Sequence, residues 1–173
     1  MRKVEVVPHN PCWQQEFERE SKLVVTVFGN NFTAIHHIGS TSIPNIHAKP
    51  IIDMLVEVID IEEVDKCNAQ MVGLGYEAMG EFGISGRRFF RKEINDIRTH
   101  HIHTFQITSP DVARHLDFRD YMIAHLEDAK QYSELKQELA KLFPHDIESY
   151  MDGKDGFIKE MQIKANNWRK SLG

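Results

Sequence analysis

The sequence predicts an α+β protein: a mixed β-sheet flanked by helices, followed by a helical C-terminal third. Three observations support this class. A helical pattern opens the chain, β-rich runs with one helical pattern between them fill the middle, and from Ser109 onward every apolar pattern has helical spacing. The chain has 173 residues without repeats, linkers or low-complexity tracts, so we expect one domain over residues 1–173.

The overall composition indicates a globular protein, with 41% hydrophobic and 27% charged residues. A formal net charge of −5 argues against a protein that binds nucleic acid through a bulk positive field. No apolar run approaches the roughly 18–20 residues of a membrane span, and the N-terminus lacks the apolar core of a signal peptide. Cys12 and Cys67 stand in no paired motif. These features predict a cytoplasmic protein with reduced thiols.

The first half of the chain begins with a helix and continues with two strands. Asn10 is the expected N-cap and Pro11 the first helical residue, and Gly29-Asn30 provides a stop signal. β-rich and helical patterns predict the next three elements: strands over 32–38 and 51–58, and a helix over 60–74.

The second half is expected to open with a hairpin and to end in helices. Strands are predicted over 76–86, 87–94 and 98–108. Ser109 and Pro110 form the next helix start, Pro144 breaks the helical run, and residues 155–168 form a last amphipathic helix.

Gly39-Ser40 directly follows a predicted strand. A glycine permits close approach of the backbone to a ligand, and a following nest of N–H groups suits phosphate, although most Gly-Ser pairs are plain turns. Thirteen residues after Ser40, Asp53 lies on the strand face opposite the apolar one. An aspartate there requires a partner, solvent or a cation. Beside a phosphate-binding turn, Asp53 would hold magnesium against a nucleotide. The alternative is an ion pair between Asp53 and Lys49. Lys49 is in turn either a phosphate ligand or a plain loop cation.

His101 and His103 share one face of the predicted strand over 98–108, about 6.7 Å apart along it. Imidazole favours zinc, iron or nickel over magnesium, so the pair is a candidate transition-metal site. As cations the two rings would instead contact phosphate. A packed or hydrogen-bonded pair of histidines is the third interpretation, and the sequence leaves all three open.

Basic residues are interleaved with Phe89 and Phe90 in RRFFRKEI, residues 87–94. Together Arg87, Arg88, Arg91 and Lys92 would form one wall of a pocket for an anionic ligand. Alternation puts Arg88 on the face of Phe90 and Lys92, and Arg87 on the face of Phe89 and Arg91. The alternative is a solvated hairpin face. Arg119 and Asp120 form either a structural ion pair or part of the cleft.

Several blocks resemble a known family. Gly-Ser, a short spacer and a strand aspartate are similar to the signature of the DNA-polymerase-β-like nucleotidyltransferase fold. More closely, HIGSTSIPNIHAKPIIDMLVEV resembles the core of the GrpB family. VEVVPHNPCWQQEFERE near the start, HIH at 101–103 and HLDFRDYMIAHLEDAKQYSELK near the C-terminus resemble that family too, so the likeness covers nearly the whole chain. Members are assigned to the nucleotidyltransferase superfamily and also occur fused to dephospho-CoA kinase.

The resemblance implies roles for particular residues. Gly39, Ser40 and Thr41 would contact nucleotide phosphates, and Asp53 would be the first carboxylate ligand of Mg²⁺ or Mn²⁺. The superfamily pattern asks for a second acid two residues later, where this chain has Leu55.

The other acids of that pattern have no ordinary counterpart here. Glu57 lies roughly 13 Å along the strand from Asp53, so it is a poor replacement that reaches only the edge of the site. In place of the third acid the chain offers His101 and His103, which suit Zn²⁺ or Ni²⁺.

Three functions follow as hypotheses. The first is a metal-dependent, nucleotidyltransferase-like protein that binds a nucleotide or another phosphorylated small molecule. The second is a catalytically silent nucleotide-binding module that assists a partner enzyme such as dephospho-CoA kinase. The third is a hydrolase built on a transition metal at the two histidines. Whether the chain is an enzyme is left open by its depleted set of acids.

Overall fold

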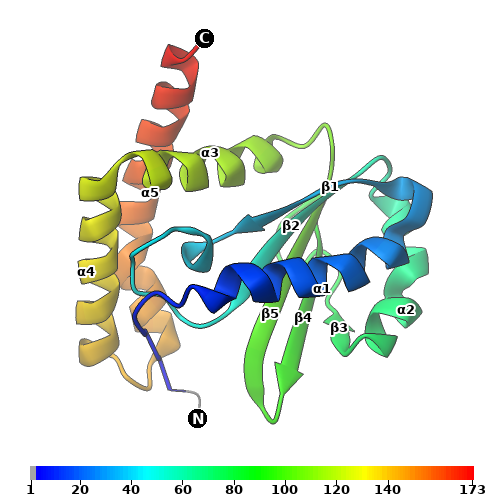
Figure 1. Ribbon diagram of the computed structural model, residues 1–173, viewed down its shortest axis with the longest axis horizontal. Coiled ribbons are helices and arrows are strands. Elements are labelled where there is room, and N and C mark those ends of the chain that lie inside the picture. Colours follow the sequence, from blue (N-terminus) through cyan, green and yellow to red (C-terminus); the bar gives the residue numbers. More distant parts are fainter. Residues whose placement is uncertain (1–2) are drawn as a thin grey trace. The chain divides into compact units, whose positions relative to one another are not determined.

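The computed structural model describes residues 3–173 and has the predicted α+β class, with a five-stranded mixed sheet and a helical C-terminal segment (Figure 1). Ten helices and strands make up most of the described chain: α1 Cys12–Phe28, β1 Phe32–Ile38, β2 Ile52–Val58, α2 Asn68–Gly73, β3 Tyr76–Ala78, β4 Arg88–Ile94, β5 Ile97–Gln106, α3 Pro110–Ala124, α4 Leu126–Leu142 and α5 Ile147–Ser171. Short 3₁₀ helices cover Gly29–Asn31, Ser40–Ser42 and Glu62–Cys67. No helix in residues 3–173 is long and apolar enough to cross a bilayer.

The chain divides into two compact units. The sheet unit comprises Pro11–Gly39 and Ile51–Ala113, and the helical unit comprises residues 3–10, Ser40–Pro50 and Arg114–Gly173. The expectation of a single domain over residues 1–173 stays a prediction.

The sheet has the order β1-β2-β5-β4-β3. β2 and β5 are parallel, and the other neighbours are antiparallel. In the parallel pair Asp53 lies opposite His101 and Leu55 opposite His103. Two strands far apart in the sequence therefore bring the carboxylate and both imidazoles together.

Helix α1 packs on one face of the sheet (Figure 1). From this helix Glu20 accepts a hydrogen bond from Lys92 of β4, and Glu16 lies 3.1 Å from His100 of β5. Side chains alternate along a strand, so His101 and Asp53 project from the opposite face. The predicted apolar face of residues 52–58 is buried as expected.

Helices α4 and α5 of the helical unit lie side by side (Figure 1). A Cβ added at Gly153 of α5 would stand 2.5 Å from Leu139 Cδ2 of α4, so the contact admits only glycine without repacking. Tyr150 lies with Leu139 and Val4 in one buried cluster. A second cluster contains eight buried residues: Ile43, Ile46, Tyr121, Met122, Ala129, Tyr132, Met161 and Ala165.

The structure corrects several predicted elements of the sheet unit. α1 begins at Cys12, with Pro11 rather than Asn10 as N-cap, although Gly29 does end it with φ +56°. The helix expected over 60–74 is a 3₁₀ helix followed by the short α2. The strand expected over 76–86 ends at Ala78, because three glycines beyond it adopt positive φ values that no strand contains: Gly80, Gly83 and Gly86.

Two corrections concern the C-terminal helices. The helical run up to Pro144 is divided at His125, whose φ of −123° and ψ of 84° separate α3 from α4. The last helix starts at Ile147 instead of Asp155, with Asp146 as its N-cap accepting from the Ser149 N–H. The predicted N-cap of α3 is supported, because the Ser109 hydroxyl accepts a hydrogen bond from the backbone of Asp111.

Candidate functional site

Asp53 stands between two histidines on the sheet face opposite α1. Its Oδ1 lies 3.3 Å from His101 Nδ1 and 3.3 Å from His103 Nε2. The three side chains are 25%, 20% and 15% exposed, in that order. We call these three residues the Asp53 cluster. They are partly shielded from water and still open to a small ligand.

Arg87 fixes the orientation of His103. Its Nη1 lies 3.2 Å from His103 Nδ1. A guanidinium can only donate, so Nδ1 accepts, and the proton of the neutral ring sits on Nε2, from which it is donated to Asp53. Arg87 is itself held, since its N–H groups also donate to the carbonyls of Glu81 and Phe82. The guanidinium lies 4.6 Å from the centre of the Phe89 ring.

His101 has a different environment. Its Nδ1 faces Asp53, while its Nε2 is buried and has no hydrogen-bond partner among residues 3–173. Buried ring nitrogens are normally satisfied, so an orphaned one requires an explanation. A ligand atom that the protein itself does not supply is one such explanation.

The Asp53 cluster keeps its carboxylate ionised. Burial alone would raise the pKa of Asp53, but the hydrogen bonds from His101 and His103 outweigh it. The pKa of Asp53 therefore lies well below the usual range of an aspartate. At neutral pH the site therefore presents an ionised carboxylate oxygen between one imidazole nitrogen of His101 and one of His103.

Gly39 closes the site from the backbone side. It has φ +74°, and a Cβ added there would lie 2.6 Å from Asp53 Oδ2 and 3.0 Å from Asp53 Cβ. Both the left-handed backbone and the close approach require glycine. This glycine lets the backbone directly after β1 pass against the carboxylate.

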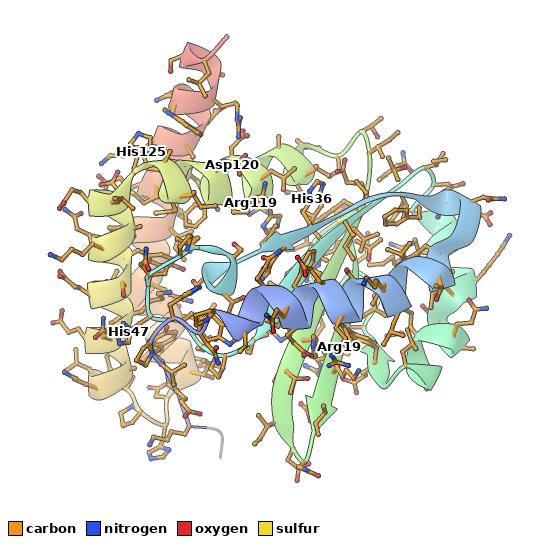
Figure 2. The ribbon with its side chains drawn as sticks, in the orientation of Figure 1. Arg19, His36, His47, Arg119, Asp120 and His125 are labelled. Carbon is orange, nitrogen blue, oxygen red and sulfur yellow. The ribbon has the colours of Figure 1, made fainter. Side chains whose placement is uncertain are left out.

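The donor set of the Asp53 cluster suits one transition-metal ion better than a pair of magnesium ions. One carboxylate and two imidazoles favour zinc, iron or nickel, whereas magnesium prefers oxygen ligands. Leu55, at the position of a second acid, is fully buried. Glu57 is engaged elsewhere, because its Oε2 lies 2.6 Å from Nε2 of His36 on β1 (Figure 2). A metal at His103 Nε2 must displace the proton that this nitrogen donates to Asp53.

The other predicted phosphate ligands lie away from the Asp53 cluster or in the helical unit. The Arg88 guanidinium donates to Asp65 at 2.7 and 3.3 Å, on the opposite sheet face from its neighbour Phe89. Ser40 and Thr41 belong to a 3₁₀ helix of the helical unit, where Thr41 is buried. Lys49 of the same unit has its Nζ 5.5 Å from the centre of the Tyr150 ring.

Arg119 and Asp120 form an ion pair on α3 (Figure 2). Asp120 also pairs with Arg169 of α5, which donates to Asp117 as well. These contacts tie the two helices together. The structural interpretation of Arg119 and Asp120 accounts for both side chains.

A second group of possible metal ligands lies under α1. The ligand atoms of Glu16, Glu20 and His100 lie within 4.8 Å of one another, a grouping that the sequence analysis missed. Cations of the protein already occupy its surroundings: Lys92 Nζ lies 2.9 Å from Glu20 and Arg19 is paired with Glu16. We interpret this group as a buried ion-pair network.

A surface hollow of about 370 Å³ lies elsewhere in the sheet unit, at the β3 edge. It contains no member of the Asp53 cluster. Its lining consists of Val72, Gly75, Tyr76, Glu77, Arg91 and Glu93.

Fold and site define an α+β protein whose mixed sheet carries one aspartate between two histidines. Over residues 3–164 the chain matches the family model described as GrpB protein, and it belongs to the GrpB family. The expectation drawn from the sequence blocks is thereby confirmed at the level of the family.

Several known proteins are similar to this chain. UPF0157 protein YqkA of Bacillus subtilis is 49% identical over 169 residues, covering 98% of this chain and 49% of that protein. This chain thus spans about half the length of that relative. The crystal structure of conserved protein GrpB from Enterococcus faecalis superposes with a TM-score of 0.91 at 42% identity, covering 95% of this chain and 99% of that one. A dephospho-CoA kinase of Mycobacterium leprae is 22% identical over 195 residues, covering 97% of this chain and 48% of the kinase.

Proposed function

We propose that this GrpB protein is a metal-dependent, nucleotidyltransferase-like protein that binds a nucleotide or another phosphorylated small molecule. The observation that carries the proposal is the Asp53 carboxylate, ionised between two imidazoles with the backbone of Gly39 against it. This arrangement offers mixed oxygen and nitrogen ligands at a partly open site.

Asp53, His101 and His103 would hold the metal ion. A bound ion would supply Lewis-acid neutralisation of phosphate oxygens. The chain's own residues prepare the site: Arg87 orients the His103 ring, and Gly39 leaves room for the Asp53 carboxylate. Such pre-organisation reduces the cost of ordering side chains when a ligand binds.

A second candidate is a nucleotide-binding module without turnover. The buried Leu55 favours it, because ordinary two-metal transfer needs further carboxylates and Leu55 cannot ligate. Such a module would assist a partner enzyme, with dephospho-CoA kinase proposed on the strength of the shared segment in the mycobacterial kinase. Pyrophosphate release from a bound nucleoside triphosphate would distinguish transfer from silent binding.

Thermal unfolding of the metal-stripped protein tests the proposal. The panel is a set of nucleoside triphosphates, each with Mg²⁺, Mn²⁺, Zn²⁺ or Ni²⁺. A ligand at a hundred times its dissociation constant stabilises the native state by about 2.7 kcal/mol, which raises the Tm of a chain this size by roughly 5–10 °C. We expect a nucleotide shift that requires metal and is lost in Asp53→Asn.

Glu57→Gln is the matched control, because Glu57 is a carboxylate of the same strand and face, paired with a histidine outside the cluster. It should retain the full nucleotide shift. A strong shift with zinc alone and none with any nucleotide would overturn the proposal and favour a histidine-based transition-metal hydrolase. An equal nucleotide shift in Asp53→Asn would show that binding takes place elsewhere.

A further inference from the structure

Lys136 is a buried lysine that has no counter-ion among residues 3–173. It lies in the middle of α4, its side chain is 1% exposed, and its Nζ has no hydrogen-bond partner among the described residues. Burying an unpaired ammonium is expensive, so such a group normally finds an acid or stays neutral. In the part of the chain that the structure describes, the charged groups acting on Lys136 are lysines and not acids.

The neighbours of Lys136 are two further lysines and two tyrosines of the helical unit. Lys154 comes from α5 and Lys49 from the segment before β2, and both raise the local positive charge. The Nζ of Lys136 lies 4.3 Å from the centre of the Tyr132 ring. The Tyr150 ring lies 4.9 Å from Lys154 Nζ and 5.5 Å from Lys49 Nζ. Three separate segments therefore bring three amines together over two aromatic rings.

The Tyr150 hydroxyl is the second orphaned group. Its side chain is fully buried, and its oxygen has no hydrogen-bond partner in residues 3–173. Burial, and then the neighbouring Tyr132, raise the pKa of Tyr150, so the phenol stays protonated and available as a donor. A buried donor and a buried amine lacking partners in one place indicate a missing acceptor.

We propose that Lys49, Lys136, Lys154 and the Tyr150 hydroxyl form a binding site for a phosphate group. The site is separate from the Asp53 cluster, and it does not depend on the function proposed for that cluster. It would take inorganic phosphate or the phosphate of an ester.

Charge and donor chemistry favour phosphate over a carboxylate. A carboxylate brings one negative charge, whereas phosphate brings up to two near neutral pH and more acceptor oxygens for several N–H and O–H donors. Lysine binds phosphate as a point charge that can be approached from several sides. Aromatic rings beneath Lys136 and Lys154 stabilise the ammonium form while the anion is bound.

Proton uptake gives the proposal a specific signature. Burial first, and then the charges of Lys154 and Lys49, lower the pKa of Lys136 to about 6. At pH 7.5, above this pKa, most of the Lys136 amines would be neutral. A bound dianion favours the charged form, so binding near this pH takes up close to one proton per site.

Calorimetric titration with inorganic phosphate, pyrophosphate and tripolyphosphate tests the site, in two buffers of different ionisation enthalpy at pH 7.5. We expect saturable binding with the dependence on buffer that proton uptake produces. Lys136→Met should weaken binding at least tenfold and abolish the uptake. It should also raise the Tm without ligand, because it removes an unpaired buried amine. Lys130→Met, an exposed lysine of the same helix, is the matched control and should bind as the wild type does.

Further variants separate this site from the Asp53 cluster. Tyr150→Phe keeps the ring and removes only the hydroxyl, so it should weaken phosphate binding several-fold. In metal-stripped protein, Asp53→Asn should leave phosphate binding at the lysines unchanged, because this site contains no residue of the Asp53 cluster. In metal-stripped Asp53→Asn protein, where the Asp53 cluster holds no metal, a titration with a nucleoside monophosphate is added. Equal affinity for phosphate and this nucleotide would identify free phosphate as the ligand, and at least tenfold tighter binding of the nucleotide would identify a phosphate ester. No saturation by any of the three anions at 10 mM, or equal binding by Lys136→Met, would overturn the site.

Discussion

Replacing Gly39 with alanine should destabilise the protein by about 2–4 kcal/mol and should displace the Asp53 carboxylate. Two costs add. The left-handed backbone at φ +74° costs a side chain roughly 1–2 kcal/mol. The new Cβ would meet Asp53 Oδ2 at 2.6 Å, where ordinary contact begins at 3.4 Å, so the carboxylate must move. Moving it weakens hydrogen bonds to a charged group, each worth about 1.5–3 kcal/mol when complete.

Gly83→Ala separates the two costs. Gly83 is exposed, has φ +88°, and a Cβ there meets nothing within 4 Å, so this variant reports the backbone term alone. Urea unfolding of both variants gives the difference in the free energy of unfolding. We expect Gly39→Ala to cost at least 1 kcal/mol more than Gly83→Ala. Equal costs would refute the inference that Gly39 is required by the position of Asp53.

Three further predictions concern packing, burial and pH. Gly153→Ala should lower the free energy of unfolding by about 1–3 kcal/mol, because its Cβ would lie 2.5 Å from Leu139. Gly156→Ala, in open space on the same helix, should instead raise it by about 0.5–1 kcal/mol. Urea unfolding measures both, and a more stable Gly153→Ala than Gly156→Ala would contradict the packing. Glu20→Gln should cost about 3–5 kcal/mol, since it leaves the Lys92 ammonium without its carboxylate; a loss below 1 kcal/mol would contradict a structural role for the pair. Burial would raise the pKa of Glu20, but hydrogen bonds, first of all that from Lys92, lower it below 4.5 in the folded state. The stabilisation that the carboxylate provides is therefore complete above the unfolded pKa of about 4.5, and it is lost as the pH falls through the folded pKa. The difference in the free energy of unfolding between wild type and Glu20→Gln should accordingly shrink below about pH 4. Urea unfolding curves recorded from pH 3 to 7 would measure it. A difference that stays constant over this range would contradict the prediction.

Strands with simple local patterns were predictable from the sequence. The strand expected over 32–38 has the bounds of β1, and β2 begins one residue later than expected. Here alternation of apolar and polar residues, with glycine beside the strand end, gives enough local information. Asp53 could be singled out for the same reason, as a charge inside a buried strand.

Features that depend on distant partners were missed. Helix α5 was expected to begin at Asp155 but begins at Ile147, so it includes Gly153, a residue type of low helix propensity. Gly153 is tolerated within the helix because its missing side chain leaves room for Leu139 of α4. The local sequence around Gly153 gives no sign of this contact. A contact between helices therefore outweighed the intrinsic propensity of the segment.

The contact of Arg87 with His103 could not be predicted for a related reason. The sequence indicated a basic hairpin, with Arg87 and Arg88 both among the candidate residues of a pocket wall. The pairing of β4 with β5 sets Phe89 opposite His103, and the Arg87 guanidinium reaches the ring of that histidine. Alternation did give the correct face for Phe89, but the register between the strands could not be derived from either strand alone.

The most direct test of the central claim is the metal stoichiometry of the Asp53 cluster. Metal-stripped protein is dialysed to equilibrium against Zn²⁺, Ni²⁺ or Mn²⁺, and the bound metal is measured by elemental analysis. The account predicts one ion per chain for the wild type and for Glu57→Gln, and none for Asp53→Asn at the same free-metal concentration. Retention of the same ion by Asp53→Asn, or no binding by the wild type, would contradict it.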